Sequence, residues 1–226
     1  MPYRVVIPIF DDVTQLDFTG PAQIFAKVPD LDVCIAAPDE TPVATDSGFA
    51  VLAPYTFSDC PDADLVCVPG GGGIMAAIQD AAFMHFVEGQ CAQAQTCTSV
   101  CTGMFALGAL GLVRGRRVTT HWGYTDVIAD CGGIYTPGRV VVDGDLITAG
   151  GVTSGIDFAL SAIAQVFDEG TARLIQLAMQ YDPQPPFQSG HPENAHEETL
   201  AAAGSIYQER TRQMRAALQA AAAARS

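Results

Sequence analysis

The stretch Thr-Cys-Thr-Ser-Val-Cys-Thr-Gly, residues 96–103, joins two kinds of secondary structure at a single residue. Its first part consists of β-forming residues and ends on Cys101, and the small and apolar residues 103–112 that follow are typical of a helix. This strand–turn–helix order is that of a nucleophile elbow, in which a tight turn lifts one side chain above a sheet. The stretch therefore predicts an α/β fold with Cys101 at the carboxyl end of a strand.

Short apolar runs on both sides of this stretch predict further buried strands. They lie at 5–10, 31–37, 64–69 and 146–149, a further strand is expected at 117–120, and shorter strand pairs are expected inside 42–57 and 134–149. Helical patterns lie between and after them, at 14–27, 81–93, 124–131, 154–166 and 169–180. The Gly20-Pro21 pair is expected to break the first of these helices or restart it. This alternation predicts a mostly parallel sheet covered by helices on both faces.

The end of the chain differs in character from the rest. We expect one α/β domain over residues 1–182, followed over residues 183–226 by a Pro-rich connector and an Ala-rich C-terminal helix. That helix is predicted to pack on the body or on a second subunit. It carries three arginines, but a DNA-binding role is disfavoured because the rest of the chain is strongly acidic.

Composition excludes several classes of protein. The chain has 226 residues, of which 49% are hydrophobic, and a net charge of −14. Binding to nucleic acid or to an anionic membrane needs a basic face, and so acidic a chain offers none. No segment approaches the length of a membrane span, and the N-terminus lacks the pattern of a secretory signal. We therefore expect a cytoplasmic protein that acts on small molecules.

The seven cysteines are the next candidates for chemistry. They form no CxxC pair and no Cys/His cluster at zinc spacing, so neither a metal site nor a disulfide framework is predicted. Cys101 would stand at a helix N-terminus, where the local dipole lowers a thiol pKa and makes the thiolate available. The alternative is that Cys101 is one more buried cysteine, like Cys34 or Cys67.

Other residues are predicted to lie near the same crevice. The run Gly70–Gly73 follows a strand end, and its backbone N–H groups would stabilise developing negative charge. As a dinucleotide loop it lacks the acidic residue expected about twenty positions later. Asp17 sits among apolar residues, and is either an exposed loop carboxylate or an acid/base group whose pKa is raised by burial.

Two further strand ends could border a ligand. His121 and Trp122 follow the strand 117–120, and Gly150-Gly151 follow the strand 146–149. A Cys–His pair between Cys101 and His121 stays open, although a structural role for this histidine is favoured.

Four segments together resemble the ThiJ/PfpI-like superfamily, which is related to the class I glutamine amidotransferases. They are Leu16–Pro21, Val68–Gly71, Ser99–Gly103 and Thr119–Trp122. Within the superfamily the chain most resembles the isonitrile hydratases, over essentially its whole length. The resemblance implies a flavodoxin-like sandwich, a homodimer, and no metal or organic cofactor.

The resemblance also implies roles for particular residues. The nucleophile corresponds to Cys101, its partner carboxyl to Asp17, and the residue after the nucleophile to Thr102, with the anion-stabilising turn at Gly70 and Gly71. The implied reaction is hydration of an isonitrile to an N-substituted formamide through a covalent thioimidate. The protease-like branch has a histidine where Thr102 stands, so a Cys–His protease is disfavoured.

Two alternatives remain at this point. The same cysteine and carboxyl would serve a glyoxalase-like enzyme acting on reactive carbonyls. A protein without enzymatic activity could instead use Cys101 as an oxidisable sensor or to bind a small ligand. The superfamily's transcription regulators carry a helix-turn-helix domain after this one, and none is predicted here, which favours an enzyme.

Overall fold

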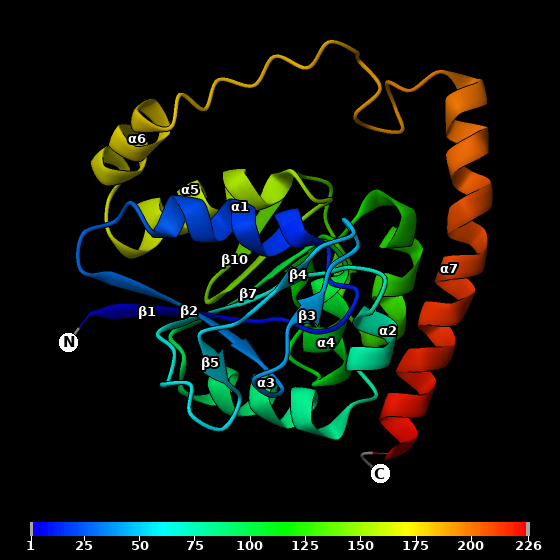
Figure 1. Cartoon of the computed structure of the whole chain (residues 1–226). Coiled ribbons are helices and arrows are strands. Elements are labelled where there is room, and N and C mark those ends of the chain that lie inside the picture. The colour runs from blue at the N-terminus through cyan, green and yellow to red at the C-terminus, as the bar shows by residue number, and fades with distance from the viewer. Residues whose placement is uncertain (1, 225–226) are drawn as a thin grey trace.

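The computed structural model describes residues 2–224, and within them a seven-stranded sheet forms the centre of the molecule (Figure 1). Its strand order is β10-β11-β7-β6-β1-β2-β5. The strands are β1 Tyr3–Pro8, β2 Leu31–Ala37, β5 Tyr55–Thr56, β6 Leu65–Val68, β7 Thr96–Val100, β10 Val140–Asp143 and β11 Leu146–Ala149. All neighbours pair in parallel except the β10–β11 hairpin. The predicted mostly parallel α/β fold is confirmed.

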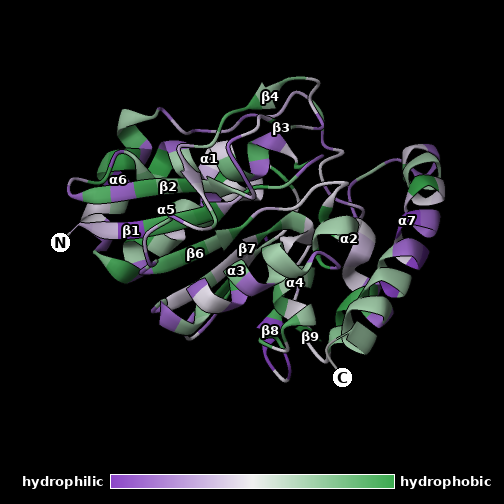
Figure 2. Ribbon diagram, turned by 60° about the horizontal axis from the view of Figure 1, so that its bottom comes forward, coloured by the Kyte–Doolittle hydropathy of each residue, from purple (hydrophilic) through white to green (hydrophobic). Residues whose placement is uncertain are grey.

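Helices cover both faces of this sheet (Figure 1). One face carries α1 Gln15–Phe25, α5 Ser154–Val166 and α6 Glu169–Ala178, with α5 packed between the other two. The opposite face carries α2 Ile74–Ala77, α3 Ala81–Gln93 and α4 Met104–Ala109. Because both faces are covered, β6 and the buried part of β1 are apolar, as the green of β6 in Figure 2 shows, whereas β7 carries three buried hydroxyl residues, Thr96, Thr98 and Ser99.

The strand register brings the functional segments together. In β1, β6, β7 and β11, all parallel, Val6 pairs with Val66, Val68 with Ser99, and Val100 with Ala149. Their carboxyl ends therefore meet at one edge of the sheet, where ligands bind in open α/β folds. The segments that follow these strands, which include residues 13–17, 69–73, 101–103 and 150–152, share that edge.

Helix α1 corrects one prediction. Gly20-Pro21 does not break it, and Pro21 lies inside a continuous helix. The proline is buried against α5, where a Cβ added to Gly155 would lie 3.2 Å from the Pro21 ring. Tight packing on a neighbouring helix compensates for the lost backbone hydrogen bond, which the local sequence does not reveal.

Short elements complete the body. Strands β3 Val43–Ala44 and β4 Ala50–Val51 form an antiparallel pair, and β8 Arg117–Val118 pairs in parallel with β9 Ile134–Tyr135. The helix predicted at 124–131 is a 3₁₀ helix, η2 Trp122–Cys131.

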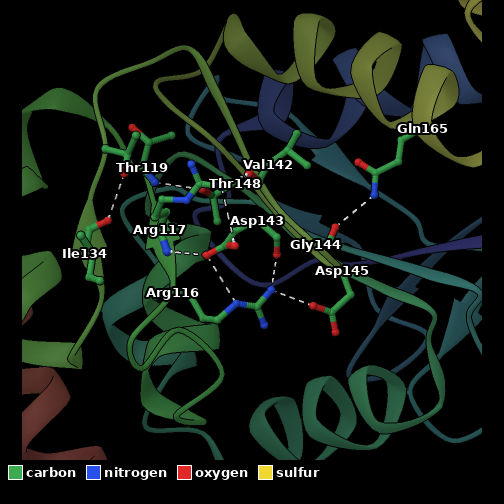
Figure 3. Close-up of polar contacts among 11 residues, drawn as sticks. Arg116, Arg117, Thr119, Ile134, Val142, Asp143, Gly144, Asp145, Thr148 and Gln165 are labelled. Atoms are coloured by element: carbon green, nitrogen blue, oxygen red, sulfur yellow. Dashed lines mark hydrogen bonds and ion pairs between the residues drawn. The ribbon is translucent and has the colours of Figure 1, made fainter.

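Polar contacts fasten β8 to the β10–β11 hairpin (Figure 3). Arg116 contacts the side chains of Asp143 and Asp145. The Thr119 N–H donates to Thr148 Oγ1 at 2.8 Å, which fixes the segment leading to His121 next to β11.

The C-terminal helix α7, Glu197–Ala224, packs on the body of its own chain. It runs along η2, α4 and α2, after a connector that crosses over the sheet edge (Figure 1). Its buried face consists of Thr211, Met214, Ala217 and Ala221. Arg215 pairs with Asp126 and Asp130 of η2, so this arginine fastens the helix to the body.

Candidate active site

Cys101 is the first residue after β7 and opens the one-turn 3₁₀ helix η1 Cys101–Gly103. Its φ is +56°, a left-handed conformation that costs a residue with a Cβ about 1 kcal/mol or more. Two hydrogen bonds hold it there. The Cys101 N–H donates to the Gly150 carbonyl at 2.9 Å, and the Cys101 carbonyl accepts from Thr120 Oγ1 at 2.7 Å. This is the strained geometry of a nucleophile elbow.

Glycines allow this turn to lie close to the neighbouring strand end. A Cβ on Gly103 would lie 2.1 Å from the Val68 carbonyl oxygen, and one on Gly70 would lie 2.6 Å from the backbone nitrogen of Thr102. A side chain at either position would push the turn after β6 away from the elbow. The short distance between the two turns therefore depends on these glycines.

Asp17 lies on α1 and is fully buried at this junction. Its Oδ2 accepts a hydrogen bond from the Gly70 N–H at 2.9 Å, while Oδ1 has no hydrogen-bond partner in the protein. Burial raises the pKa of the carboxyl from 3.8 to about 7, although the Gly70 N–H and the Cys101 thiol both favour its ionised form. Asp17 is thus the buried acid/base candidate of the two alternatives, not an exposed loop residue.

The thiol of Cys101 does not have the lowered pKa that its place at a helix start predicted. Its side chain is buried, and burial together with the negative charge of Asp17 raises the pKa well above the ordinary value. The backbone N–H groups of Thr102 and Val152 face the sulfur and favour the thiolate, but they do not reverse the effect of burial. The resting form is therefore a thiol beside a carboxyl that ionises near neutrality.

The N–H groups of the glycine turn already have acceptors within the protein. The Gly70 N–H is taken up by Asp17, and the Gly71 N–H donates to Thr102 Oγ1 at 3.1 Å. Neither group is free to bind a charge that develops on a substrate. The turn instead positions Asp17 and Thr102, and the N–H groups that face the sulfur are those of Thr102 and Val152.

His121 is neutral and does not pair with the thiol. Burial lowers its pKa to about 4, and the charge of Arg210 adds to this effect. Its Nδ1 accepts from the Gly123 N–H at 3.1 Å, and its Nε2 lies 3.4 Å from the hydroxyl of Tyr207. The group beside the thiol is the carboxyl of Asp17.

A cavity of about 510 Å³ opens next to the elbow. His121, Trp122, Gly150 and Gly151 all line it, together with Val152, whose N–H faces the Cys101 sulfur. Residues 190–194 of the connector line its other side. The cavity is large enough for a small organic molecule.

Three residues near the thiol were absent from the sequence prediction: Tyr124, Tyr207 and Arg210. Burial raises the pKa of Tyr124 and of Tyr207, and the charge of a Cys101 thiolate raises both further. Arg210 forms a hydrogen bond with the Tyr124 hydroxyl. Tyr124 is close to the Thr-Thr-His-Trp motif and could have been included on that ground. Tyr207 and Arg210 lie on α7, and no local pattern marks them.

Most of the remaining cysteines share the raised pKa of Cys101. Burial raises the pKa of Cys34, Cys60, Cys67 and Cys131. Cys97 is the exception, because a hydrogen bond from Cys91 lowers its pKa, but it lies near the other end of β7. Among residues 2–224, no three His, Cys, Asp or Glu side chains gather in a group that could hold a metal. No helix of this part of the chain has the length and apolarity to cross a membrane.

Comparison with known proteins agrees with this arrangement. A sequence model described as the DJ-1/PfpI family matches residues 3–165. The isonitrile hydratase of Pseudomonas putida is 44% identical over 195 residues, which cover 86% of each chain. A glutathione-independent glyoxalase, DJR-1.2 of Caenorhabditis elegans, is 25% identical over 59% of this chain and 72% of its own.

Among solved structures, a ThiJ/PfpI family protein from Pseudomonas syringae superposes with a TM-score of 0.93. It is 35% identical, and the match covers 96% of this chain and 91% of that one. The elbow, the parallel sheet and the matched residues lead to one conclusion: this chain belongs to the DJ-1/PfpI family.

Proposed function

We propose that this chain is an enzyme that hydrates isonitriles to N-substituted formamides, with Cys101 as nucleophile and Asp17 as acid and base. The observation that carries the proposal is the buried Asp17 carboxyl, whose pKa is raised to about 7 beside the Cys101 thiol. The 44% identity to an isonitrile hydratase supports this substrate class.

The first step joins the sulfur to the isonitrile carbon. A thiol with a raised pKa needs a base as it attacks, and a carboxyl that ionises near pH 7 suits that task. The ionised Asp17 takes the thiol proton as the C–S bond forms and delivers it to the same carbon. A thioimidate, R–N=CH–S–Cys101, results, with no proton gained or lost overall.

The second step consumes one water molecule. Asp17 takes a proton from water as the water oxygen adds to the thioimidate carbon, and passes that proton to the nitrogen. The C–S bond then breaks, the hydroxyl proton returns through Asp17 to the sulfur, and R–NH–CHO leaves. The N–H groups of Thr102 and Val152 face the sulfur and stabilise its negative charge as it departs.

Formamide production from cyclohexyl isonitrile by the purified protein tests this directly. We expect product with the wild type and none with Cys101→Ala. Asp17→Asn should cripple turnover while Cys101 still reacts with iodoacetamide. Full activity in either variant would remove that residue from the mechanism, and no product from the wild type would overturn the proposed reaction.

A glyoxalase activity is the second candidate, because the glyoxalase DJR-1.2 shares part of this sequence. Methylglyoxal in the same assay separates the two reactions, since its product is a hydroxy acid. Faster turnover of methylglyoxal than of any isonitrile would favour this second function. A sensor based on oxidation of Cys101 is less well supported, because burial and the raised pKa both disfavour a reactive thiolate.

The proposal includes a homodimer and a cytoplasmic location. An apolar groove of about 430 Å³ between α1 and α5, lined in part by Leu16, Ile24 and Ile156, offers a face for a second copy. Light scattering on the purified protein tests this, and a monomer would contradict it. All seven cysteines are free, which suits a reducing compartment.

A further inference from the structure

One residue of the C-terminal helix reaches the wall of the active site. Tyr207 is half-buried, and its ring centroid lies 5.0 Å from that of His121, 4.8 Å from Trp122 and 5.6 Å from Tyr124. It also lies directly on the backbone of η2, since a Cβ on Gly123 would come within 2.5 Å of the Tyr207 ring. Tyr207 thus contacts four consecutive residues, His121 to Tyr124.

His121, which Tyr207 contacts, in turn contacts the loop beside the nucleophile. A Cβ on Gly151 would lie 2.8 Å from Cδ2 of His121, so the imidazole rests on the Gly151 backbone. The next residue is Val152, whose N–H faces the Cys101 sulfur. A continuous series of contacts therefore joins Tyr207 to the group that holds the sulfur.

The same helix brings charge to the site. Arg210, one turn after Tyr207, forms a hydrogen bond with the Tyr124 hydroxyl. Tyr124 and Tyr207 are both close enough to Cys101 for its negative charge to act on their hydroxyls. The titratable side chains on which the charge of Cys101 acts are thus Asp17 from α1, Tyr124 from η2 and Tyr207 from α7.

We propose that Tyr207 is a positioning residue of the active site, which fixes His121 and thereby the Gly151-Val152 backbone against the Cys101 sulfur. His121, Trp122 and Gly151 line the cavity beside the elbow, although Cys101 itself does not, so Tyr207 also contributes to the shape of that cavity. Tyr207 lies on the C-terminal helix, outside residues 3–165 that match the family model. The kinetic part of the proposal rests on the isonitrile reaction, whereas the effect on the thiol does not.

Two substitutions disturb this contact in different ways. Tyr207→Leu keeps an apolar side chain but removes the ring, and Gly123→Ala keeps the ring but pushes it away from η2. Tyr207→Phe keeps the ring and removes only the 3.4 Å contact to His121. Ile206→Ala, at an exposed neighbouring position of α7, is the matched control.

Each variant is measured in three ways. The alkylation rate of Cys101 by iodoacetamide is followed by mass spectrometry of its peptide at several pH values at which the variant stays folded, because the thiolate is the reactive form and its fraction rises with pH. The values of kcat and KM are measured for cyclohexyl isonitrile and for methyl isonitrile. Thermal unfolding shows whether the variant is folded.

For folded Tyr207→Leu and Gly123→Ala, we expect Cys101 to be alkylated more slowly than in the wild type at each pH, because a displaced Val152 N–H stabilises the thiolate less. We also expect kcat/KM to fall about tenfold or more, since small displacements at a site have such effects. Raised KM should be most evident for the cyclohexyl substrate, which fills more of the cavity. Tyr207→Phe and Ile206→Ala should stay within about twofold of the wild type in both assays.

A wild-type alkylation profile in both folded ring-disturbing variants, with unchanged kcat/KM, would overturn the proposal. If kcat/KM falls as far in Tyr207→Phe as in Tyr207→Leu, the proposed role of the ring is overturned. If Tyr207→Leu does not fold, the alkylation rate and kcat/KM of Gly123→Ala decide whether the proposal holds. If no isonitrile is turned over by the wild type, the proposed function fails, and the alkylation profiles still decide the role of Tyr207.

Discussion

Asp17 and Gly70 share one hydrogen bond, from the Gly70 N–H to Oδ2 at 2.9 Å, and this bond leaves the second carboxyl oxygen without a partner. A buried polar atom without a hydrogen-bond partner costs free energy, and its presence here points to a catalytic role. The carboxyl is held in place through one oxygen, while the other can exchange a proton with the thiol or with water. The glycine turn after β6 therefore orients an acid/base group.

The first prediction concerns the pH dependence of turnover. Asp17 must be ionised to take the thiol proton, and burial raises its pKa to about 7. We expect kcat/KM for an isonitrile to rise with pH up to about 7 and to level off above it, falling about tenfold per pH unit on the acid side. Initial rates across the pH range check this. A midpoint near the ordinary carboxyl value of 3.8 would contradict a raised pKa of the base.

The second prediction concerns stability. The pKa of Asp17 is raised on folding, so stability linked to this group is fully present below about pH 4 and is lost as the pH rises to about 7. A shift of about three pKa units corresponds to a loss of the order of 4 kcal/mol above pH 7. Asp17→Asn should therefore unfold at a higher denaturant concentration than the wild type at pH 8. The difference should shrink toward pH 4, and a less stable variant at pH 8 would contradict the argument.

The third prediction compares alanine substitutions at two glycines, Gly70, which contacts Asp17, and Gly89, which does not. In Gly70→Ala the new Cβ would lie 2.6 Å from Thr102 Oγ1 and 2.9 Å from Asp17 Oδ2, so both side chains must move. We expect kcat/KM to fall about 100-fold. The control is Gly89→Ala on α3, where a Cβ meets nothing within 4 Å. It should keep full activity and gain up to about 1 kcal/mol of stability. Equal activity in the two variants would exclude the orienting role of Gly70.

The fourth prediction concerns Thr120. Its hydroxyl donates to the Cys101 carbonyl at 2.7 Å in a buried place, and so helps to hold the left-handed turn. Thr120→Val keeps the shape and removes the donor, which should cost about 1–3 kcal/mol in the free energy of unfolding and slow turnover. Thr120→Ser keeps the hydroxyl and should behave like the wild type. Urea unfolding and initial rates measure both effects, and an unaffected Thr120→Val would show that other contacts suffice.

Much of the fold follows from local sequence. Apolar runs, glycines at strand ends and the elbow stretch at 96–103 are short-range signals, and they predicted the parallel sheet and the place of Cys101. Pro21 was misjudged because its environment is supplied by Gly155, which is distant in the sequence. Tertiary packing outweighed the local rule.

The chemistry of the site was harder to predict than its location. A helix start favours a thiolate, but burial and Asp17 act in the other direction and are stronger. The acceptors of the Gly70 and Gly71 N–H groups are side chains from α1 and η1, so local sequence could not show how this turn is bonded. Tyr207 lies 106 residues after Cys101 on a helix whose sequence shows only its own amphipathic pattern.

The left-handed backbone at Cys101 has a consequence for how such a protein can evolve. Glycine adopts a φ of +56° without strain, so Cys101→Gly would relax the elbow, just as Asp17→Asn would remove a buried charge. Selection for stability alone would thus favour replacement of both residues, because each replacement removes one source of strain or buried charge, and the product would be an inactive protein. Their retention in a lineage would record selection for catalysis, and their joint loss would mark a copy released from it.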